Sequence, residues 1–233
     1  GMETTEATVS LQFQNLGLDL KSGACVLEGV TGEFAAGKMI GILGPSGSGK
    51  TTFMNVLCGK ATYGTMRGKV NVNGQECDIR SIRSVVGFVP QDDIVHERLT
   101  VRENFEFAAE LRLPPSTTKE RRKAVVEDIL NIMQMVHIQT SIVGSVEERG
   151  ISGGQRKRVN IGLEIAACPS LLFLDEPTSG LDSTSSLSIL TSLKKMTQLG
   201  VTVIMVIHQP RYTLFTLFDD VLLLGKGGRT VYL

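Results

Sequence analysis

The chain has 233 residues, of which 42% are hydrophobic and 21% charged, as in an ordinary globular protein with one large domain or two small ones sharing a core. Its 24 basic and 24 acidic side chains cancel, which excludes a general attraction to nucleic acid or to an anionic membrane. No apolar run reaches the roughly 18 residues of a membrane span, and the four cysteines lack metal-ligand spacing. The composition therefore predicts a soluble domain in which any anion site is local.

Strands are predicted in the N-terminal part of the chain. Residues 9–13 and 26–34 alternate loosely between apolar and polar side chains, as short antiparallel strands do. Residues 39–43 form a compact apolar strand that runs directly into a glycine-rich loop. Residues 69–72, followed by Asn73-Gly74, predict the edge of a hairpin.

The periodicity becomes helical from Leu99 onward. Thr100 to Glu103 form a capping box, and Pro114-Pro115 ends the helix that begins there. Thr117, with Glu120 three residues later, is predicted to cap a second helix. We therefore expect a mostly helical insert over residues 93–150 within one core made of residues 1–92 and 151–233.

Strands and helices alternate after this insert. Residues 171–174 predict a short buried strand, residues 182–199 predict a helix ended by Gly200, and residues 201–207 and 221–224 predict two more strands. Short apolar strands that alternate with helices imply a parallel sheet covered on both faces. The predicted fold class is α/β, with a mostly parallel core sheet, an antiparallel β subdomain and a helical subdomain.

The glycine-rich loop after residues 39–43 matches the pattern G-x-x-x-x-G-K-[ST], which is typical of P-loop NTPases. Glycines let the backbone wrap around phosphates with its N–H groups inward, and the following helix adds the positive end of its dipole. Lys50 is predicted to reach the β- and γ-phosphates, and Thr51 to offer its hydroxyl to Mg²⁺. The predicted nucleotide-binding residues are Gly44, Pro45, Ser46, Gly47, Ser48, Gly49, Lys50, Thr51 and Thr52.

Two carboxylates follow the apolar strand at residues 171–174. In open α/β sheets, ligands bind beyond the carboxyl ends of the strands. Asp175 is placed there to hold Mg²⁺ through its water shell, and Glu176 to accept a proton from an attacking water. Acidic residues end many strands, so these two carboxylates alone would be weak evidence for a site. The phosphate loop in the same chain is what favours a functional role for them. Together the two motifs predict hydrolysis of a nucleoside triphosphate.

A second anion site is predicted at Ile151-Ser152-Gly153-Gly154-Gln155, where a helix begins with bare backbone N–H groups. This run resembles the signature sequence of ATP-binding cassette (ABC) proteins, and the motifs occur in that family's order over nearly the whole chain. The resemblance implies that two subunits dock head to tail, so that Ser152, Gly153, Gly154 and Gln155 of one face the γ-phosphate held by the other. The alternative, a glycine-capped helix with Arg156-Lys157-Arg158 as a solvated face, requires the other motifs to be coincidental.

The resemblance also assigns roles to three further residues. Gln91 is similar to the glutamine that contacts Mg²⁺ and the attacking water and that links the core to the helical insert. Asp182 lies in a loop similar to the one that crosses the dimer interface, and His208 resembles the switch histidine at the γ-phosphate. The implied catalytic residues are Lys50, Gln91, Glu176 and His208, and the implied Mg²⁺ ligands are Thr51, Gln91 and Asp175.

One position departs from the family's pattern. Many members stack adenine on an aromatic residue before the first core strand. That place falls near Leu20 here, and no Tyr, Trp or Phe occurs between Phe13 and Phe34. Leu20 and Val26 are predicted to offer an apolar wall instead, with weaker discrimination between bases.

Residues 87–93, 149–158 and 207–211 look like those of the white-type (G subfamily) half-transporters. That likeness implies a transmembrane domain beyond Leu233, a place on the cytoplasmic face of a membrane, and a second cassette as partner in a homo- or heterodimer. It implies no contact of this chain with nucleic acid or with the transported substrate. The predicted function is an ATP-hydrolysing cassette that drives transport.

Three alternatives are weighed against this function. A soluble ABC ATPase acting on nucleic acid or ribosomes usually carries coiled-coil insertions or tandem cassettes, and neither occurs here. A regulatory cassette without turnover is expected to lack Glu176 or His208, and both are present. A small-molecule P-loop kinase leaves the run from Ser152 to Gln155 unexplained.

Overall fold

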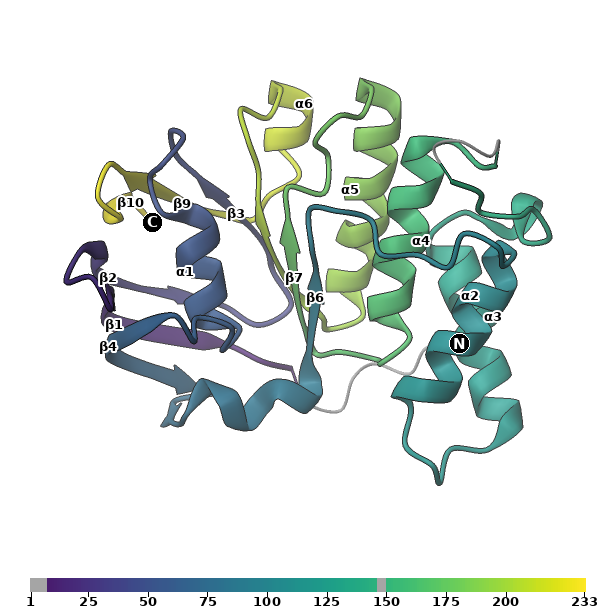
Figure 1. Ribbon diagram of the computed structural model, residues 1–233, viewed down its shortest axis with the longest axis horizontal. Coiled ribbons are helices and arrows are strands. Elements are labelled where there is room, and N and C mark those ends of the chain that lie inside the picture. The colour runs from purple at the N-terminus through teal and green to yellow at the C-terminus, as the bar shows by residue number, and fades with distance from the viewer. Residues whose placement is uncertain (1–7, 146–149) are drawn as a thin grey trace.

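The computed structural model describes residues 8–145 and 150–233, which fold around two β-sheets (Figure 1). The first sheet is antiparallel, with strand order β2-β1-β4-β5. Its strands are β1 (Leu11–Leu20), β2 (Cys25–Phe34), β4 (Gly64–Val72) and β5 (Gln75–Glu76). The turn at Asn73-Gly74 joins β4 to β5, with both residues at positive φ. The predicted antiparallel subdomain and its hairpin edge are confirmed.

The second sheet has the strand order β10-β9-β3-β8-β7-β6, and all its pairs are parallel except β9 with β10. Its strands are β3 (Met39–Leu43), β6 (Val86–Val89), β7 (Leu171–Asp175), β8 (Thr202–Val206), β9 (Asp220–Gly225) and β10 (Arg229–Tyr232). The predicted α/β fold with a mostly parallel core sheet is therefore confirmed. The antiparallel edge strand β10 was not predicted.

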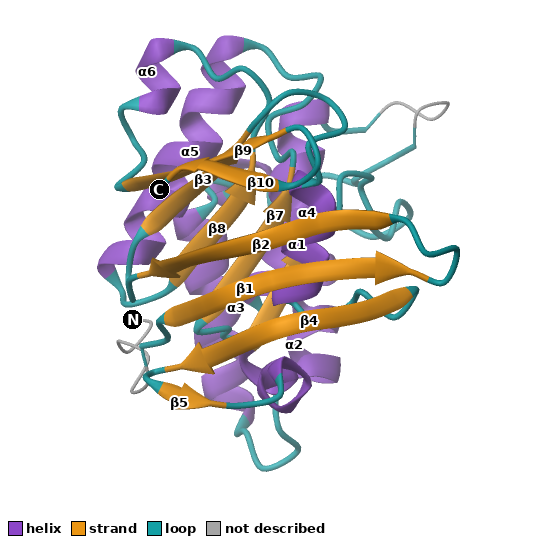
Figure 2. Ribbon diagram, turned by 90° about the vertical axis from the view of Figure 1, so that its left-hand side faces the viewer, coloured by secondary structure: helices purple, strands orange, loops and turns teal. Residues whose placement is uncertain are grey.

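Side chains that alternate along the parallel strands fill two separate apolar clusters. On β7, Leu172 and Leu174 face the cluster beneath the helices, whereas Leu171 and Phe173 face the cluster toward the antiparallel sheet. Figure 2 shows the antiparallel sheet lying across the parallel one. Because both faces of β7 and β8 are covered, all ten of their residues are buried, which explains the continuous apolar runs in the sequence.

Helices cover the parallel sheet on both sides (Figure 1). Helix α1 (Lys50–Leu57) lies on the side of the antiparallel sheet, where Phe53 packs edge-on against Phe13 and Phe34. The longer helices are α2 (Val101–Arg112), α3 (Lys119–Ile132), α4 (Gly153–Ile165) and α5 (Ser183–Gln198); the shorter ones are α1 (Lys50–Leu57), α6 (Tyr212–Phe215) and the 3₁₀ turns Ile79–Val85 and Val136–Ile138. No helix in the described part of the chain is both long enough and apolar enough to cross a membrane.

Helix α4 meets α2 and α3 at a glycine. A Cβ on Gly162 would lie 2.5 Å from a ring carbon of Phe105 on α2 and 3.0 Å from Ile129 on α3. Only glycine therefore permits this close approach of the three helices. The contact joins the helical insert to the helix that begins at Gly153.

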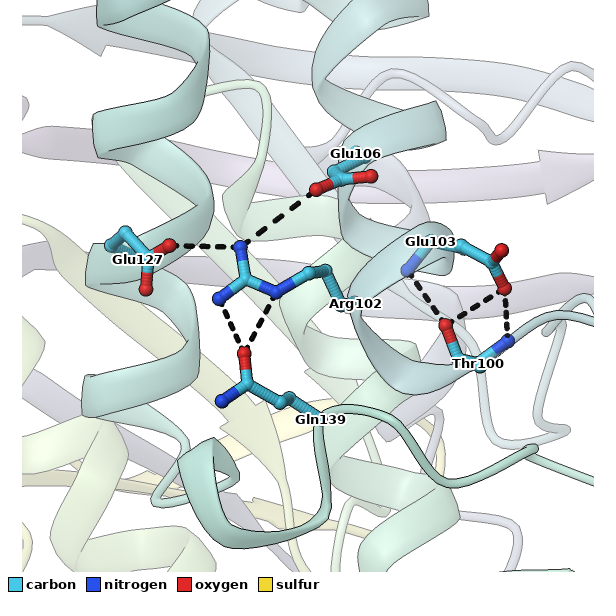
Figure 3. A network of polar contacts seen from close by, with 6 residues as sticks. All are labelled: Thr100, Arg102, Glu103, Glu106, Glu127 and Gln139. Carbon is cyan, nitrogen blue, oxygen red and sulfur yellow. Dashed lines mark hydrogen bonds and ion pairs between the residues drawn. The ribbon is translucent and has the colours of Figure 1, made fainter.

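Arg102 connects the two helices of the insert to the segment that follows them (Figure 3). Its guanidinium donates to Glu127 on α3 at 2.8 Å and, through Nε, to Gln139 at 2.7 Å. This arginine holds the pKa of the Glu127 carboxyl below its ordinary value, through the hydrogen bond first. Beside it, Thr100 and Glu103 form the predicted capping box, with each side chain bonded to the other residue's backbone N–H.

The cap of α3 differs from the prediction. Thr118, not Thr117, is the N-cap, and its hydroxyl accepts from the backbone N–H of Arg121 at 3.2 Å. The N–H of Thr117 instead donates to the carbonyl of Pro114, which closes a turn after the proline pair. After that turn, Thr118 has the extended backbone that is typical of an N-cap, with φ −67° and ψ 157°.

The shifted cap gives a stability prediction with a built-in control. Thr118→Ala is expected to lower the free energy of unfolding by about 1 kcal/mol, because the N–H of Arg121 loses its acceptor. Thr117→Ala removes the same hydroxyl one residue earlier and is expected to change stability by less than half as much. Urea denaturation of the two variants measures the difference, and equal losses would contradict the assignment of the cap.

Candidate functional site

Four parallel strands end at one edge of the core sheet, and each is followed by a residue that the sequence singles out. Gly44 follows β3, Gln91 lies two residues after β6, Asp175 ends β7, and His208 lies two residues after β8. Because β3, β8, β7 and β6 run in the same direction, these residues lie along the same edge. This is the edge at which α/β proteins bind their ligands.

The loop between β3 and α1 is tightly wound and is packed against β9. Gly44 has φ 152°, and a Cβ there would lie 2.3 Å from the carbonyl oxygen of Leu224 and 2.6 Å from the Ser48 hydroxyl. Gly49 is the left-handed N-cap of α1, so that the first N–H groups of the helix stay free of a side-chain cap. Pro45, Ser46 and Gly47 are exposed at the tip of the loop, and Thr52 follows in the first turn of α1.

Lys50 is buried within this loop, with only 7% of its surface exposed. Its Nζ donates to the carbonyls of Gly44 and Pro45, both at 3.0 Å. Beside it, the hydroxyl of Ser48 is buried and has no hydrogen-bond partner within the described residues. Buried polar atoms are almost always paired, so an unpaired hydroxyl inside a glycine-rich loop fits a loop that binds a polar ligand such as a phosphate.

Thr51 and Asp175 bring a hydroxyl and a carboxylate together next to the loop. The Thr51 Oγ1 donates to Asp175 Oδ1 at 3.3 Å, across 124 residues of sequence. Burial raises the pKa of the Asp175 carboxyl, and the bond from Thr51 opposes that rise. Among residues 8–145 and 150–233, no group of three or more His, Cys, Asp or Glu side chains is arranged so that it could hold a metal ion. A hydroxyl with a single carboxylate fits Mg²⁺, which keeps several waters and shares phosphate oxygens with few protein ligands.

Glu176 is turned away from its strand and toward Gln91. It has φ 47°, an unusual backbone conformation outside glycine, and its N–H donates to the carbonyl of Val206 at the end of β8. The Gln91 Nε2 donates to Glu176 Oε2 at 3.4 Å. An open pocket of about 460 Å³ is lined by Glu176, Thr178, Ser179, Gly180 and His208. The structure therefore brings Glu176 and His208 to one hollow, and Gln91 contacts Glu176 beside it.

The run from Ser152 to Gln155 begins α4 as a second capping box. The Ser152 hydroxyl accepts from the N–H of Gln155, and the Gln155 side chain accepts from the N–H of Ser152. Ser152 and Gly153 are exposed, whereas Gly154 is buried against α5. A Cβ on Gly154 would lie 2.8 Å from the Ser185 hydroxyl on that helix. Among the described residues, no hydrogen bond joins this run to the phosphate loop of the same chain.

Three further residues that the sequence singles out lie at the start of α5 and on the first two strands: Asp182, Val26 and Leu20. The Asp182 carboxylate caps α5 and accepts from the N–H groups of Thr184 and Ser185, and the bonds from Ser185 lower its pKa. The carbonyl oxygen of Val26 lies 3.3 Å from where a Cβ on Gly49 would be, which puts this part of β2 beside the loop. Leu20 ends β1 and bonds within the turn to β2, through its N–H to Ala24 and its carbonyl to Gly23.

Two buried polar residues of α4 were missed by the sequence reasoning. Lys157 donates to the carbonyl of Gln91 at 2.7 Å, and the Asn160 Oδ1 accepts from the N–H of Ile94 at 3.2 Å. Both lie at helical spacing from the buried residues Gly154 and Ile161. That spacing was the available signal, since it places Lys157 on the buried face and not on a solvated one.

The chain is similar to known proteins over most of its length. Residues 27–179 match a family model described as "ABC transporter", and residues 208–233 match one described as "ABC-2 type transporter". ABC transporter G family member 28 of Arabidopsis thaliana is 49% identical over 96% of this chain and 20% of that protein. ABC transporter G family member 25 of Oryza sativa subsp. japonica is 50% identical over 89% of this chain and 21% of that protein. The chain thus spans about a fifth of the length of these relatives.

A solved structure shares the fold. It is titled as cbiO1 from Clostridium perfringens, part of the ABC transporter complex cbiONQ, and it aligns with a TM-score of 0.82 and 24% identity. The alignment covers 97% of this chain and 88% of that one. The family model covers more than half of the sequence, and the G family relatives match nearly all of it. The chain therefore belongs to the ABC transporter family.

Proposed function

We propose that this chain binds MgATP and hydrolyses its γ-phosphate bond to drive transport across a membrane. The observation that carries the proposal is the meeting of two polar pairs beside the phosphate loop. Thr51 contacts Asp175 at 3.3 Å, and Gln91 contacts Glu176 at 3.4 Å. The first pair has the chemistry of a metal site and the second that of a site which orients and deprotonates water.

Binding begins with the loop and the start of α1. Its amide groups and the positive end of the helix dipole neutralise phosphate oxygens, and Lys50 exchanges its two carbonyl partners for the β- and γ-phosphates. Thr51, Asp175 and Gln91 would hold Mg²⁺, which neutralises charge on the β- and γ-oxygens when bound. The apolar contribution of Leu20 and Val26 to the adenine end is part of the same proposal.

The chemical step is an in-line attack of water on the γ-phosphorus. Glu176 takes one proton from the water, the new P–O bond forms as the bond to the β-phosphate oxygen breaks, and ADP and inorganic phosphate result. Gln91 shares its amide between Glu176 and the water, and His208 across the same pocket contacts the γ-phosphate. Catalysis rests on positioning and on charge stabilisation in a partly enclosed site.

A second copy or a related cassette completes the site. Ser152 and Gly153 are exposed at the start of α4. The Ser152 N–H is bonded to the Gln155 side chain, so the Gly153 N–H is the group that meets a γ-phosphate held by the partner. Gly154, Gln155 and Asp182 support that surface from α4 and α5. ATP then binds the two cassettes together, and hydrolysis separates them.

The output of this cycle is movement of membrane helices. The relatives are named as transporters and are about five times longer than this chain. We propose that a transmembrane domain adjoins the cassette on the cytoplasmic side and that residues 93–150 transmit the motion to it. The transported substrate contacts that domain.

Nucleotide binding is tested by thermal unfolding of the 233-residue chain. MgATP at 100 times its Kd is expected to stabilise the protein by about 2.7 kcal/mol, a rise of about 5–10 °C in Tm. Lys50→Met is expected to abolish this shift, because the phosphates lose their buried cation. Lys69→Met is the matched control, since Lys69 lies on β4 in an exposed ion pair with Glu76. A shift that persists in Lys50→Met would contradict the proposed phosphate site.

A further inference from the structure

The basic run Arg156-Lys157-Arg158 on α4 contains a lysine that does not face solvent. Lys157 exposes 4% of its surface, and its side chain exposes 6%. It shares the buried face of the helix with Gly154, Asn160 and Ile161. A buried ammonium group is costly unless it is paired and hydrogen-bonded, so its partners are of interest.

Among the described residues, the side-chain partners of Lys157 lie in the segment that follows β6. Its Nζ donates to the backbone carbonyl of Gln91 at 2.7 Å and pairs with the Asp93 carboxylate at 2.6 Å. One turn along the helix, Asn160 donates to the carbonyl of Asp92 and to Asp93, both at 3.4 Å, and accepts from the N–H of Ile94. Two side chains of α4 thus hold all four residues from 91 to 94.

Gln91, whose backbone carbonyl is bonded to Lys157, is also the residue whose side chain contacts Glu176. The Gln91 side chain meets Glu176 at 3.4 Å, near the limit of a hydrogen bond, so a small displacement of its backbone breaks the contact. Lys157 fixes that backbone through the carbonyl of the same residue. The start of α4 at Ser152 lies about 8 Å along the helix axis from Lys157. A rigid helix therefore links the exposed residues Ser152 and Gly153 to Gln91.

We propose that Lys157 is a positioning residue for hydrolysis, and that with Asp93 and Asn160 it sets Gln91 against Glu176. The proposal rests on the function proposed above and deepens it. A γ-phosphate from the partner that engages the start of α4 moves Gln91 through Lys157. A buried contact within one chain thus couples the two composite sites of the pair: the one to which this chain gives the start of α4 and the one to which it gives Gln91.

The test compares Lys157→Met with the wild-type chain in two measurements. The first is backbone hydrogen exchange of residues 91–94, which is expected to become at least about tenfold faster in the variant while β6 and β7 exchange as before. The second is ATP turnover, for which kcat is expected to fall about 10- to 100-fold with the Kd for MgATP changed less than about threefold. Arg156→Met is the matched control, because Arg156 lies on the same helix but pairs with Glu97.

Two further variants separate positioning from stability. Asp93→Asn combined with Lys157→Met removes both charges and is expected to restore thermal stability without restoring kcat, because the carbonyl of Gln91 still lacks its donor. In a Gln91→Ala background, Lys157→Met is expected to reduce kcat by less than about twofold, since its effect acts through the missing side chain.

Unchanged exchange at residues 91–94 in Lys157→Met would overturn the proposal, and so would a full loss of kcat in the Gln91→Ala background. A kcat that recovers together with stability in the double variant would reduce Lys157 to a role in folding. A wild-type chain that binds MgATP without turnover refutes the proposed hydrolysis instead, and the exchange measurement then decides whether Lys157 holds the segment.

Discussion

Glu176→Gln is expected to reduce ATP turnover by about 100- to 10,000-fold while MgATP binding stays within about threefold of the wild type. Glutamine has the shape of glutamate and keeps an oxygen toward Gln91, but it does not accept a proton from water. Because the proposed loop, the metal ligands and the start of α4 are untouched, ATP remains bound and the two cassettes stay together. Phosphate release and light scattering measure the two effects.

Glu106→Gln is the control for this variant, since Glu106 is an exposed carboxylate on α2 at 3.7 Å from Arg102. It is expected to change neither turnover nor association. If Glu176→Gln retained turnover, Glu176 would not be the base. If it lost turnover but stayed monomeric in saturating MgATP, the proposal that ATP completes its site with a second cassette would fail.

Gly44→Ala is expected to lower the free energy of unfolding by about 3 kcal/mol or more and to abolish MgATP binding. Its φ of 152° is strained for alanine, and the new Cβ would lie 2.3 Å from a backbone oxygen of β9. The loop must move away from Leu224 to relieve that overlap, and Lys50 loses the carbonyl of Gly44 as its support. Chemical denaturation and the MgATP-dependent shift of Tm measure the two losses.

Gly47→Ala separates the steric clash from backbone strain. Gly47 also has a positive φ, 75°, but a Cβ there meets no atom within 4 Å. Its cost is expected to be about 1 kcal/mol. Equal destabilisation by the two variants would show that close packing of the loop against β9 contributes nothing.

The fold and the strand ends were predictable because their signals are local. Continuous apolar runs arise from strands buried on both faces, as in β7 and β8, and each run is a few residues long. The residues that follow such runs were therefore recognisable as lying at one edge of a parallel sheet. The roles assigned to Gln91, Glu176, His208 and Ser152 remain predictions that the variants above test.

Features that depend on distant contacts or on one residue of register were not predictable. Lys157 contacts Gln91 across 66 residues of sequence, and the residues that flank Lys157 in the sequence do not indicate that partner. All four residues of β10 are exposed, so the strand carries no apolar alternation. Thr117 and Thr118 are adjacent and chemically identical, and the turn that starts at Pro114 decided between them.

The position of β3 between β8 and β9 has a consequence for synthesis of the chain. β3 is made early, yet both of its neighbours come from the last 32 residues of the sequence. A ribosome adding about 5–20 residues per second needs on the order of ten seconds or more to reach them after β3 emerges. Until then, β3 and the glycine-rich loop that follows it lack the strands β8 and β9 that flank β3 in the folded sheet. Nucleotide therefore cannot assist early folding of the nascent chain, and a polypeptide that stops before β9 should not bind it.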